Sequence, residues 1–307
     1  MRITTDQLFK NAYGNFALGA FNVFNAEQVH GVMRGARAAQ MPVILQMTPV
    51  ARNYMNDKML RAIIHSAAEI YPEVDFAIHL DHGNYDHCLD AISSEDYHSV
   101  MIDASHEKFE TNIGITSDVV KRAHSKDIRV EAELGVLSGV EDDTRIDDDK
   151  ARYTQPEQVV EFVTRTRCDS LAIAIGTSHG AYKFAGNQHL RLDILKKIQD
   201  MLPGYPIVLH GASAVHDDEI KRINQAGGKL RQDAKGTDLS DLQRSIALGV
   251  CKVNIATDTR LIWTRVHREF FRNTPDLFDP VVPGKEFMNA MEIMVKEKIR
   301  SLVAYKN

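Results

Sequence analysis

Eight short apolar runs recur along nearly the whole of this 307-residue chain, and no other feature constrains its fold as strongly. The stretches at 43–45, 171–175 and 207–209 are continuously apolar, as expected of strands that are covered on both faces. Segments with helical spacing separate the runs; in residues 25–40, for example, Asn25 can cap a helix. The eight runs are residues 16–23, 42–47, 75–82, 99–105, 128–135, 170–176, 206–211 and 252–257.

This alternation of strands and helices predicts βαβ units around a parallel sheet. An open doubly wound sheet fits the same alternation, but the count of eight favours closure, and no Gly-x-Gly-x-x-Gly follows the first run. We therefore expect the α/β class and a (β/α)8 TIM barrel that forms a single domain over residues 1–307. An insertion near 227–237 interrupts the rhythm, and extra C-terminal helices are expected within 260–307, over 260–273 and 287–305.

The composition of the chain argues against several classes of function. The net charge is −5 and no block of lysines or arginines is present, which disfavours nucleic-acid binding. No apolar stretch approaches the roughly 18 residues of a membrane span, and the first residues lack the layout of a signal peptide, so we expect a cytoplasmic protein with no membrane partner. Cys88, Cys168 and Cys251 form no C-x-x-C pair, so any metal would be held by imidazole and carboxylate groups.

Residues that can hold a metal, a proton or a phosphate stand at or near the C-terminal ends of the runs. They are Asn22, Thr48, Asp81, His82, Asp103, Glu133, His179, His210 and Asn254. If the runs are parallel strands of one barrel, these side chains meet at its carboxyl mouth, where such barrels carry their chemistry. The sequence thus predicts one active site assembled from distant segments.

Three of the histidines, His82, His179 and His210, are each followed by glycine at a predicted strand end. A lone histidine is more often structural than a ligand. Three neutral imidazoles at one end of a barrel, with an open fourth position, are however typical of a catalytic zinc site. Gly83 is expected to turn the backbone so that His82 reaches the mouth.

The carboxylates at the same predicted mouth each have two interpretations. Asp81 is a candidate proton donor or acceptor, or a group that orients a metal ligand. Asp103 and Glu133 can form a second metal position, or they can hydrogen-bond to the histidines. The acidic stretch 135–150 is either a solvated loop or a lid over the mouth.

Phosphate binding is indicated after the last predicted strands, since exposed backbone N–H groups commonly cradle phosphate there in barrels. A glycine in such a place is also often only a turn. Lys183 and Arg260 would supply positive charge, or they simply solubilise surface helices. The candidate substrate- and phosphate-binding residues are Asn22, Thr48, Gly180, Lys183, Gly211, Ala212, Ser213, Asn254, Ile255, Ala256, Thr257 and Arg260.

Seven segments stand in order along essentially the whole chain. They are HLDHG at 79–83, SVMIDASH at 99–106, VEAELG at 130–135, YTQPEQ at 153–158, LAIAIGTSHGAYK at 171–183, VLHGAS at 208–213 and KVNIATDTR at 252–260. Together they resemble the class II, zinc-dependent ketose-bisphosphate aldolases. The insertion at 227–237 and the FDP at 278–280 resemble the longer fructose-bisphosphate aldolase branch. The resemblance implies reversible aldol cleavage of a ketose 1,6-bisphosphate, fructose 1,6-bisphosphate first, to dihydroxyacetone phosphate and an aldehyde phosphate. That reaction belongs to glycolysis and carbohydrate metabolism.

The resemblance also implies a zinc cofactor and a homo-oligomer. His82, His179 and His210 match the zinc ligands of the family. Asp103 and Glu133 match positions that the family links to an alternate metal site, so a second divalent ion and a monovalent cation are further candidates. A homodimer or homotetramer is expected, with a small-molecule ketose phosphate as the other partner.

Two carboxylates match the acid–base groups of the family. Asp81 matches the proton donor to the C4 oxygen of the substrate. Glu141, within the acidic stretch, matches the glutamate that exchanges a proton with the dihydroxyacetone-phosphate carbon. The resemblance therefore divides the proton transfers between a strand end and a loop.

Positions on the aldehyde side depart from the family pattern. Ala256 stands where fructose-bisphosphate-type relatives commonly have aspartate, and Val281 stands where the long branch usually has a phosphate-binding arginine. Ala212 and Ser138 replace common glycines but remain small. Losing a charge-assisted phosphate contact costs roughly 1.5–3 kcal/mol. The alternatives are therefore an aldolase for tagatose 1,6-bisphosphate or for a ketose 1-phosphate. A metal-dependent sugar isomerase and a metal-stabilised scaffold are the candidates from other classes.

Overall fold

Eight parallel strands close into a barrel in the computed structural model, which describes residues 3–137, 139–141, 144–146, 152–178, 189–213, 217–231 and 236–305. Their order around the barrel is β1-β10-β9-β8-β5-β4-β3-β2. Each strand overlaps one predicted run, so the TIM-barrel prediction is confirmed. The strands are β1 (Leu18–Asn22), β2 (Val43–Met47), β3 (Phe76–Gly83), β4 (Ser99–Ile102), β5 (Arg129–Leu134), β8 (Ser170–Ile173), β9 (Ile207–Leu209) and β10 (Val250–Ile255).

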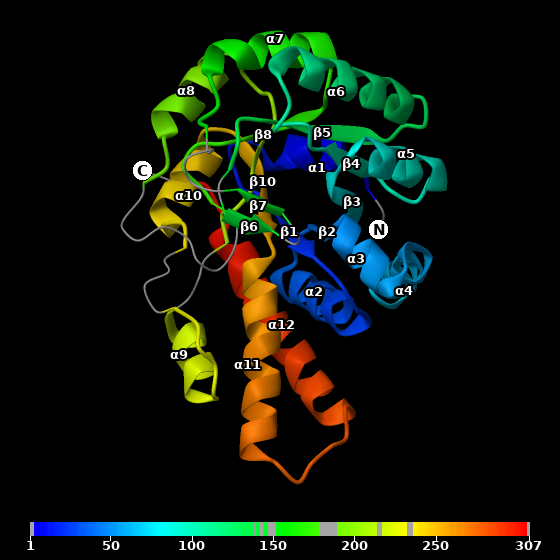
Figure 1. Cartoon of the computed structure of the whole chain (residues 1–307), viewed down its shortest axis with the longest axis vertical. Helices are drawn as coiled ribbons and strands as arrows, with labels where there is room; N and C mark the ends of the chain where they lie inside the picture. The colour runs from blue at the N-terminus through cyan, green and yellow to red at the C-terminus, as the bar shows by residue number, and fades with distance from the viewer. Residues whose placement is uncertain are drawn as a thin grey trace.

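Helices surround the barrel and bury one continuous apolar layer against the outer faces of the strands (Figure 1). They are α1 (Thr5–Ala12), α2 (Ala26–Ala39), α3 (Pro49–Met55), α4 (Asp57–Ile70), α5 (Tyr85–Ser94), α6 (Phe109–His124), α7 (Pro156–Thr166), α8 (Leu192–Met201), α9 (Asp217–Gln225), α10 (Leu239–Ala247), α11 (Thr257–Asn273) and α12 (Val281–Ser301). The predicted cap is confirmed, because the Asn25 side chain accepts a hydrogen bond from the backbone N–H of Gln28. None of the helices in these ranges is long and apolar enough to cross a membrane.

One end of the barrel is closed by α1, which leaves the other end for the site. Leu8 and Phe9 of this helix pack in one apolar cluster with inward-facing strand residues such as Ala20 and Ile44. Leu18, the first residue of β1, belongs to the same cluster, and Ile44 is the second residue of β2, so the closed end is opposite to the carboxyl mouth.

Helices α11 and α12 run antiparallel to one another and extend well beyond the barrel as an arm (Figure 1). The prediction of a helix over 287–305 was wrong in its bounds, because α12 begins at Val281 and ends at Ser301. Pro283 therefore lies in the first turn of the helix, where a proline ring is tolerated because no intrahelical N–H is required. α12 therefore begins six residues before the predicted bound of 287.

Close packing of α12 against α2 explains two glycines. A Cβ at Gly35 would lie 2.5 Å from Cβ of Val295, and one at Gly31 would overlap the Met291 side chain. Both distances are shorter than real carbon–carbon contacts, so only glycine permits this approach. The arm is thereby fixed to the first helix that follows a barrel strand.

Two stretches that interrupt the βα rhythm differ from each other. The acidic stretch, interpreted as either a solvated loop or a lid, contains a hairpin of β6 (Gly139–Glu141) and β7 (Thr144–Ile146), in which Val140 pairs with Arg145. The expectation of an irregular loop was wrong for these two segments, because their backbone groups pair with each other, and the lid stays a prediction. The insertion at 227–237 separates α9 from α10, as predicted, and its residues 232–235 lie outside the described part of the chain.

Candidate active site and metal centre

The end of β3 brings Asp81 and His82 to the barrel mouth through a bulge in the strand. The pairing with β4 shifts register between Leu80 and Gly83, so an extra residue is inserted there. His82 itself adopts the left-handed conformation, with φ of 47°. Asp81 and His82 therefore face the same space, although a regular strand would turn them to opposite sides.

The prediction that Gly83 turns the backbone was wrong, because the turn is made at His82. Gly83 is required for a different reason. A Cβ there would lie 2.6 Å from Cδ2 of Leu80 and 3.0 Å from the carbonyl oxygen of Met101. The glycine thus allows close packing behind the bulge.

Three buried amides hold the Asp81 carboxylate. Asn22 and Gln46 donate to Oδ2 over 2.9 and 3.1 Å, and Asn254 donates to Oδ1 over 2.9 Å. Gln46 also donates to Oδ1 of Asn22 over 2.7 Å, which fixes two of the amides relative to each other. A carboxylate that accepts from several neutral donors is held in one orientation without a countercharge in contact.

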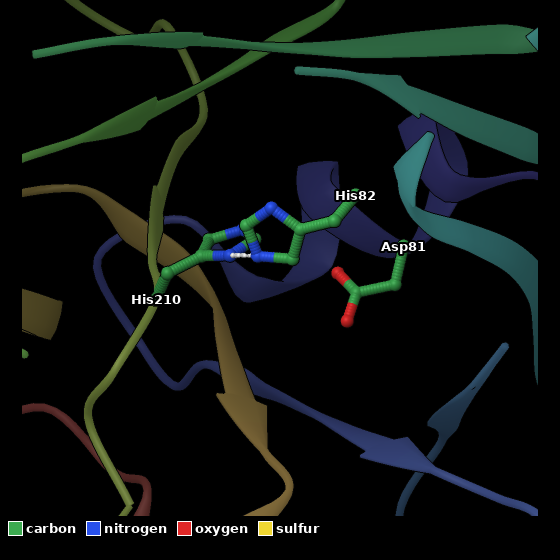
Figure 2. A group of neighbouring side chains, drawn as sticks. All are labelled: Asp81, His82 and His210. Atoms are coloured by element: carbon green, nitrogen blue, oxygen red, sulfur yellow. Dashed lines mark hydrogen bonds between the residues drawn. The ribbon is translucent and has the colours of Figure 1, made fainter. Parts of the chain in front are cut away.

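His82 and His210 face each other across the mouth (Figure 2). Nε2 of His82 lies 2.8 Å from Nδ1 of His210, which follows β9 directly. The side chains of Asp81, His82 and His210 offer ligand atoms that all lie within 4.8 Å of one another. The structure therefore brings together two of the three histidines in the predicted zinc site, with the predicted acid–base residue beside them.

Each of these histidines contacts a carboxylate through its other ring nitrogen. Nδ1 of His82 lies 3.0 Å from Oδ2 of Asp103, and Nε2 of His210 lies 2.9 Å from Oε1 of Glu131. Burial acts to raise the pKa of Asp103, but the hydrogen bond and charge of His82 hold that pKa well below its usual value. Because an ionised carboxylate can only accept, both of these ring nitrogens carry hydrogen.

This arrangement fits a bound metal ion. With hydrogen on Nε2, the neutral His210 ring turns the lone pair of Nδ1 toward Nε2 of His82. Burial and the nearby His82 charge lower the pKa of His210, which favours that neutral form. Metal-bound histidines usually donate their other ring N–H to a carboxylate, as both of these histidines do, and a zinc centre needs at least one ligand more.

Glu133 gives the mouth a second group of ligand types. His82, Asp103 and Glu133 also place one ligand atom each within 4.8 Å of the others, and Oε2 of Glu133 lies 3.9 Å from Nδ1 of His82. Glu133 is buried, whereas the Asp103 side chain is partly exposed. Both predicted carboxylates are therefore next to one of the histidines.

The predicted phosphate-binding segments meet at the same mouth. Gly211 has φ of 63°, and a Cβ there would lie 2.5 Å from the backbone oxygen of Ser178, so the backbones after β8 and β9 approach closely. The backbone N–H of Ala256 donates to Oγ of Ser213 over 3.4 Å, and Ala212 is buried beside it. These contacts join the ends of β9 and β10.

The remaining predicted substrate residues have clear places. Thr48 caps α3 by accepting from the backbone N–H of Ala51, which is a structural role. The Ile255 side chain belongs to the apolar layer outside the barrel, so only its backbone can face a ligand at the mouth. Thr257 is the first residue of α11, and the Arg260 guanidinium lies over the Phe24 ring at 5.2 Å from its centroid.

Several predicted site residues lie outside the part of the chain that the structure describes. They are Ser138, His179, Gly180 and Lys183. Glu141 lies in β6, and its side chain is likewise outside the description.

Gln46 and Glu131 were missed by the sequence analysis, although a signal for each was present. Gln46 stands alone among apolar residues of β2 and precedes Thr48 by two positions. Glu131 precedes Glu133 by two positions, and residues two apart on a strand share a face. Alternation along each strand was therefore enough to place both at the barrel interior.

Known proteins share this fold and this order of segments. A family described as fructose-bisphosphate aldolase class-II matches residues 3–306. The fructose-bisphosphate aldolase of Giardia intestinalis is 40% identical over 289 residues, which cover 92% of this chain and 87% of the relative. That of Thermus caldophilus is 39% identical over 303 residues, which cover 98% of this chain and 96% of the relative.

A solved structure agrees with these relatives. The YdjI aldolase from Escherichia coli K12 has a TM-score of 0.76 and 28% identity, over 98% of this chain and 97% of that one. The barrel, the paired histidines and the match over residues 3–306 lead to one conclusion. The chain belongs to the class II fructose-bisphosphate aldolase family and is an aldolase, a lyase that acts on a carbon–carbon bond.

Proposed function

We propose that this protein catalyses the reversible aldol cleavage of a ketose 1,6-bisphosphate, with fructose 1,6-bisphosphate as the first substrate. The products are dihydroxyacetone phosphate and an aldehyde phosphate. The observation that carries the proposal is the Asp81 carboxylate, held by three amides beside the facing nitrogens of His82 and His210. The relatives named fructose-bisphosphate aldolase support the same substrate.

Zinc is the proposed cofactor, with His82, His179 and His210 as its ligands. When bound, zinc acts as a Lewis acid that polarises the oxygens of the ketose and so stabilises the negative charge that develops when the C3–C4 bond breaks. Asp103 and Glu133 are proposed as a second divalent position, because they adjoin His82. We also propose a monovalent cation near the phosphate, and only the resemblance to the family supports it.

The proton transfers are assigned to two carboxylates. In cleavage, Asp81 accepts the C4 hydroxyl proton as the C3–C4 bond breaks and the aldehyde forms, and in condensation it returns that proton. The electron pair of the broken bond remains on the dihydroxyacetone-phosphate fragment, whose carbon takes a proton from Glu141. The amides of Asn22, Gln46 and Asn254 keep Asp81 in one orientation throughout.

The dihydroxyacetone-phosphate half is proposed to bind at the ends of β8 to β10, through Gly180, Lys183, Gly211, Ser213, Asn254 and Thr257. Exposed backbone N–H groups at these strand ends suit a phosphate. Arg260 is proposed to add positive charge on the same side.

A second candidate, an aldolase for a ketose 1-phosphate, is favoured by two residues. Ala256 offers no polar side chain to the aldehyde half, and Val281 is 53% exposed at the start of α12 with no charge to offer a distal phosphate. Tagatose 1,6-bisphosphate is the third substrate to test, because Ala256 resembles its aldolases. The isomerase and scaffold hypotheses are not carried forward, since the chain belongs to a lyase family.

Steady-state cleavage of fructose 1,6-bisphosphate, tagatose 1,6-bisphosphate and fructose 1-phosphate by the zinc-loaded protein tests these alternatives. We expect dihydroxyacetone phosphate from all productive substrates, the highest kcat/KM with fructose 1,6-bisphosphate, and no product after metal removal. A higher kcat/KM with fructose 1-phosphate would support the second candidate. Absence of product from all three substrates would contradict the proposed function.

A homodimer or homotetramer is proposed as the functional assembly. The protein is proposed to act in the cytoplasm, and its reaction is proposed to belong to glycolysis. The arm supports the assembly, because it exposes large apolar side chains: Phe278 is 92% and Phe271 61% exposed. Sedimentation equilibrium should give a mass at least twice that of the chain, and Phe271→Ser with Phe278→Ser should lower it. A monomer at micromolar concentration would contradict this assembly.

We also propose that residues 1–307 form a single domain.

A further inference from the structure

A complete ion pair lies inside the barrel, beneath the two facing histidines. Nζ of Lys252, on β10, lies 2.9 Å from Oε2 of Glu131, on β5, and both side chains are at most 2% exposed. The β10–β9 pairing shifts register between Val250 and Lys252, and this irregularity accompanies the inward position of the lysine. Neither charge is needed to solubilise the protein at such a place.

The contacts of Lys252 and His79 assign one donor and one acceptor to each hydrogen bond in the barrel interior. Lys252 contacts both oxygens of Glu131, at 3.1 and 2.9 Å, and its Nζ lies 3.4 Å from Nε2 of His79. Nδ1 of His79 lies 2.7 Å from Oγ of Ser99. Burial and the Lys252 charge lower the pKa of His79 to about 3, so this histidine is neutral and accepts at Nε2. An ammonium group only donates, and the chain of donors therefore begins at Lys252.

The other side of Glu131 contacts His210. Oε1 accepts from Nε2 of His210 over 2.9 Å, and Nδ1 of the same ring lies 3.1 Å from the Asn254 amide nitrogen and 2.8 Å from His82. Hydrogen on Nε2 and a lone pair on Nδ1 satisfy all of these contacts at once. The opposite tautomer would place a hydrogen between His210 and two groups that converge on it.

We propose that Glu131 and Lys252 form a positioning pair, which holds His210 in the Nε2-protonated tautomer with Nδ1 aimed at the metal. Glu131 accepts the ring hydrogen, and Lys252 provides the countercharge that lets a carboxylate stay charged in the barrel interior. The inference rests on the metal site of the proposed function and adds two residues to it. Because both side chains are buried in the barrel interior, we expect them to act through His210.

The energetics of buried ion pairs favour this role over a purely structural one. Removing two charges from water costs several kcal/mol per ion, and well-packed apolar residues often stabilise a protein as much as the pair does. A barrel interior can be filled with apolar side chains, as Met101, Ala172 and Val208 do here. A charged pair at this depth is therefore better explained by what it does to His210.

Two substitutions at Glu131 change its charge and the length of its side chain independently. Glu131→Asp keeps the charge beside Lys252 but withdraws the carboxylate from His210 by one methylene group. Glu131→Gln keeps the reach but offers an amide hydrogen that stabilises the wrong tautomer. Ser99→Ala is the matched control, because Ser99 lies in the same interior and contacts His79 but not His210.

Zinc binding to the metal-free full-length protein provides the first test, measured by competition with a chromogenic chelator. We expect Glu131→Asp and Glu131→Gln to raise the Kd for Zn²⁺ by about 10- to 100-fold, as other partners of metal-bound histidines do. Ser99→Ala should leave the Kd within about twofold. Folded Glu131 variants with the wild-type Kd would overturn the proposal. If a single variant does not fold, the charge-balanced Glu131→Gln/Lys252→Met double variant replaces it.

Nitrogen-15 NMR of imidazole-labelled protein without metal provides the second test, and it does not depend on activity. His210→Gln identifies the resonances of that ring. The wild type should show hydrogen on Nε2 of His210, and Glu131→Gln should shift the tautomer equilibrium toward Nδ1. Hydrogen on Nδ1 in the wild type would overturn the positioning role. Failure of the wild type to bind Zn²⁺ would instead contradict the metal site of the proposed function, while the tautomer would still test the pair.

Discussion

The two histidines that face each other at the barrel mouth are supported by contrasting surroundings. His82 contacts Asp103, and their side chains are 17% and 26% exposed. His210 contacts Glu131, and their side chains are 0% and 2% exposed. A carboxylate near water keeps its charge at little cost, whereas a buried one needs a countercharge, which Lys252 supplies. A carboxylate that supports a histidine in the barrel interior therefore needs a second charged residue, whereas a carboxylate at the rim does not.

Replacing either histidine should have the largest effect on activity, and this effect should be the same for His82 and His210. We expect His82→Ala and His210→Ala to lower kcat/KM for fructose 1,6-bisphosphate to background, roughly 1,000-fold or more, because the Lewis acid contributes several kcal/mol. A coupled assay of dihydroxyacetone phosphate measures this. His65→Ala, on the outer helix α4, is the control and should keep full activity. Retention of activity by either ligand variant would remove that residue from the metal site.

Asp81→Asn should separate acid–base chemistry from metal binding. Asparagine keeps the size of the side chain but is a poor acceptor for the C4 hydroxyl proton, so we expect kcat to fall by about 10²–10⁴-fold. Zinc affinity should stay near that of the wild type, because the paired nitrogens of His82 and His210 are untouched. Single-turnover cleavage together with a zinc titration checks both parts. A rise in the Kd for Zn²⁺ equal to the loss of kcat would contradict the acid–base role.

Stability should distinguish the interior support from the rim support. Lys252→Met leaves Glu131 buried without its countercharge, so the free energy of unfolding should fall by about 3–5 kcal/mol. Asp103→Asn, at a partly exposed position, should cost about 1 kcal/mol. Urea unfolding of the metal-free proteins measures both values, and Glu131→Gln added to Lys252→Met should restore part of the loss. Equal costs at the two positions would remove the contrast between rim and interior.

The smallest expected effect concerns the far end of the arm, where Val281 begins α12 (Figure 1). Val281→Arg should lower the KM for fructose 1,6-bisphosphate by about tenfold, because an arginine at this place can make charge-assisted contacts to the distal phosphate bound by another subunit of the proposed assembly. The KM for fructose 1-phosphate should not change, which makes that substrate the internal control. An equal change in KM for both substrates would mean that the arginine does not act through the distal phosphate.

Strand positions could be predicted from the apolar runs, because a barrel strand covered on both faces is mostly apolar along its length. The mouth followed from the same runs, since the candidate histidines and carboxylates stood where the strands end. Bulges could not be predicted in this way. The extra residues near His82 and Lys252 change which side chains face inward, and nothing in the order of polar and apolar residues indicates them.

The interior pair was missed for a related reason. Glu131 and Lys252 lie in strands that were interpreted from their apolar neighbours, so a polar residue counted as a local exception. Their role depends on contact between strands that are far apart in the sequence, and a single sequence does not contain that pairing. Alternation from Glu133 was the available clue for Glu131.

The packing of α12 on α2 through Gly31 and Gly35 has a consequence for how the chain acquires its structure. Arg34 on α2 bonds to Asn289 on α12, a partner 255 residues further along the chain. During synthesis, the early helix is therefore made long before its partner leaves the ribosome. Its apolar face must remain exposed or covered by a chaperone over that time, and slow elongation should increase aggregation of this protein.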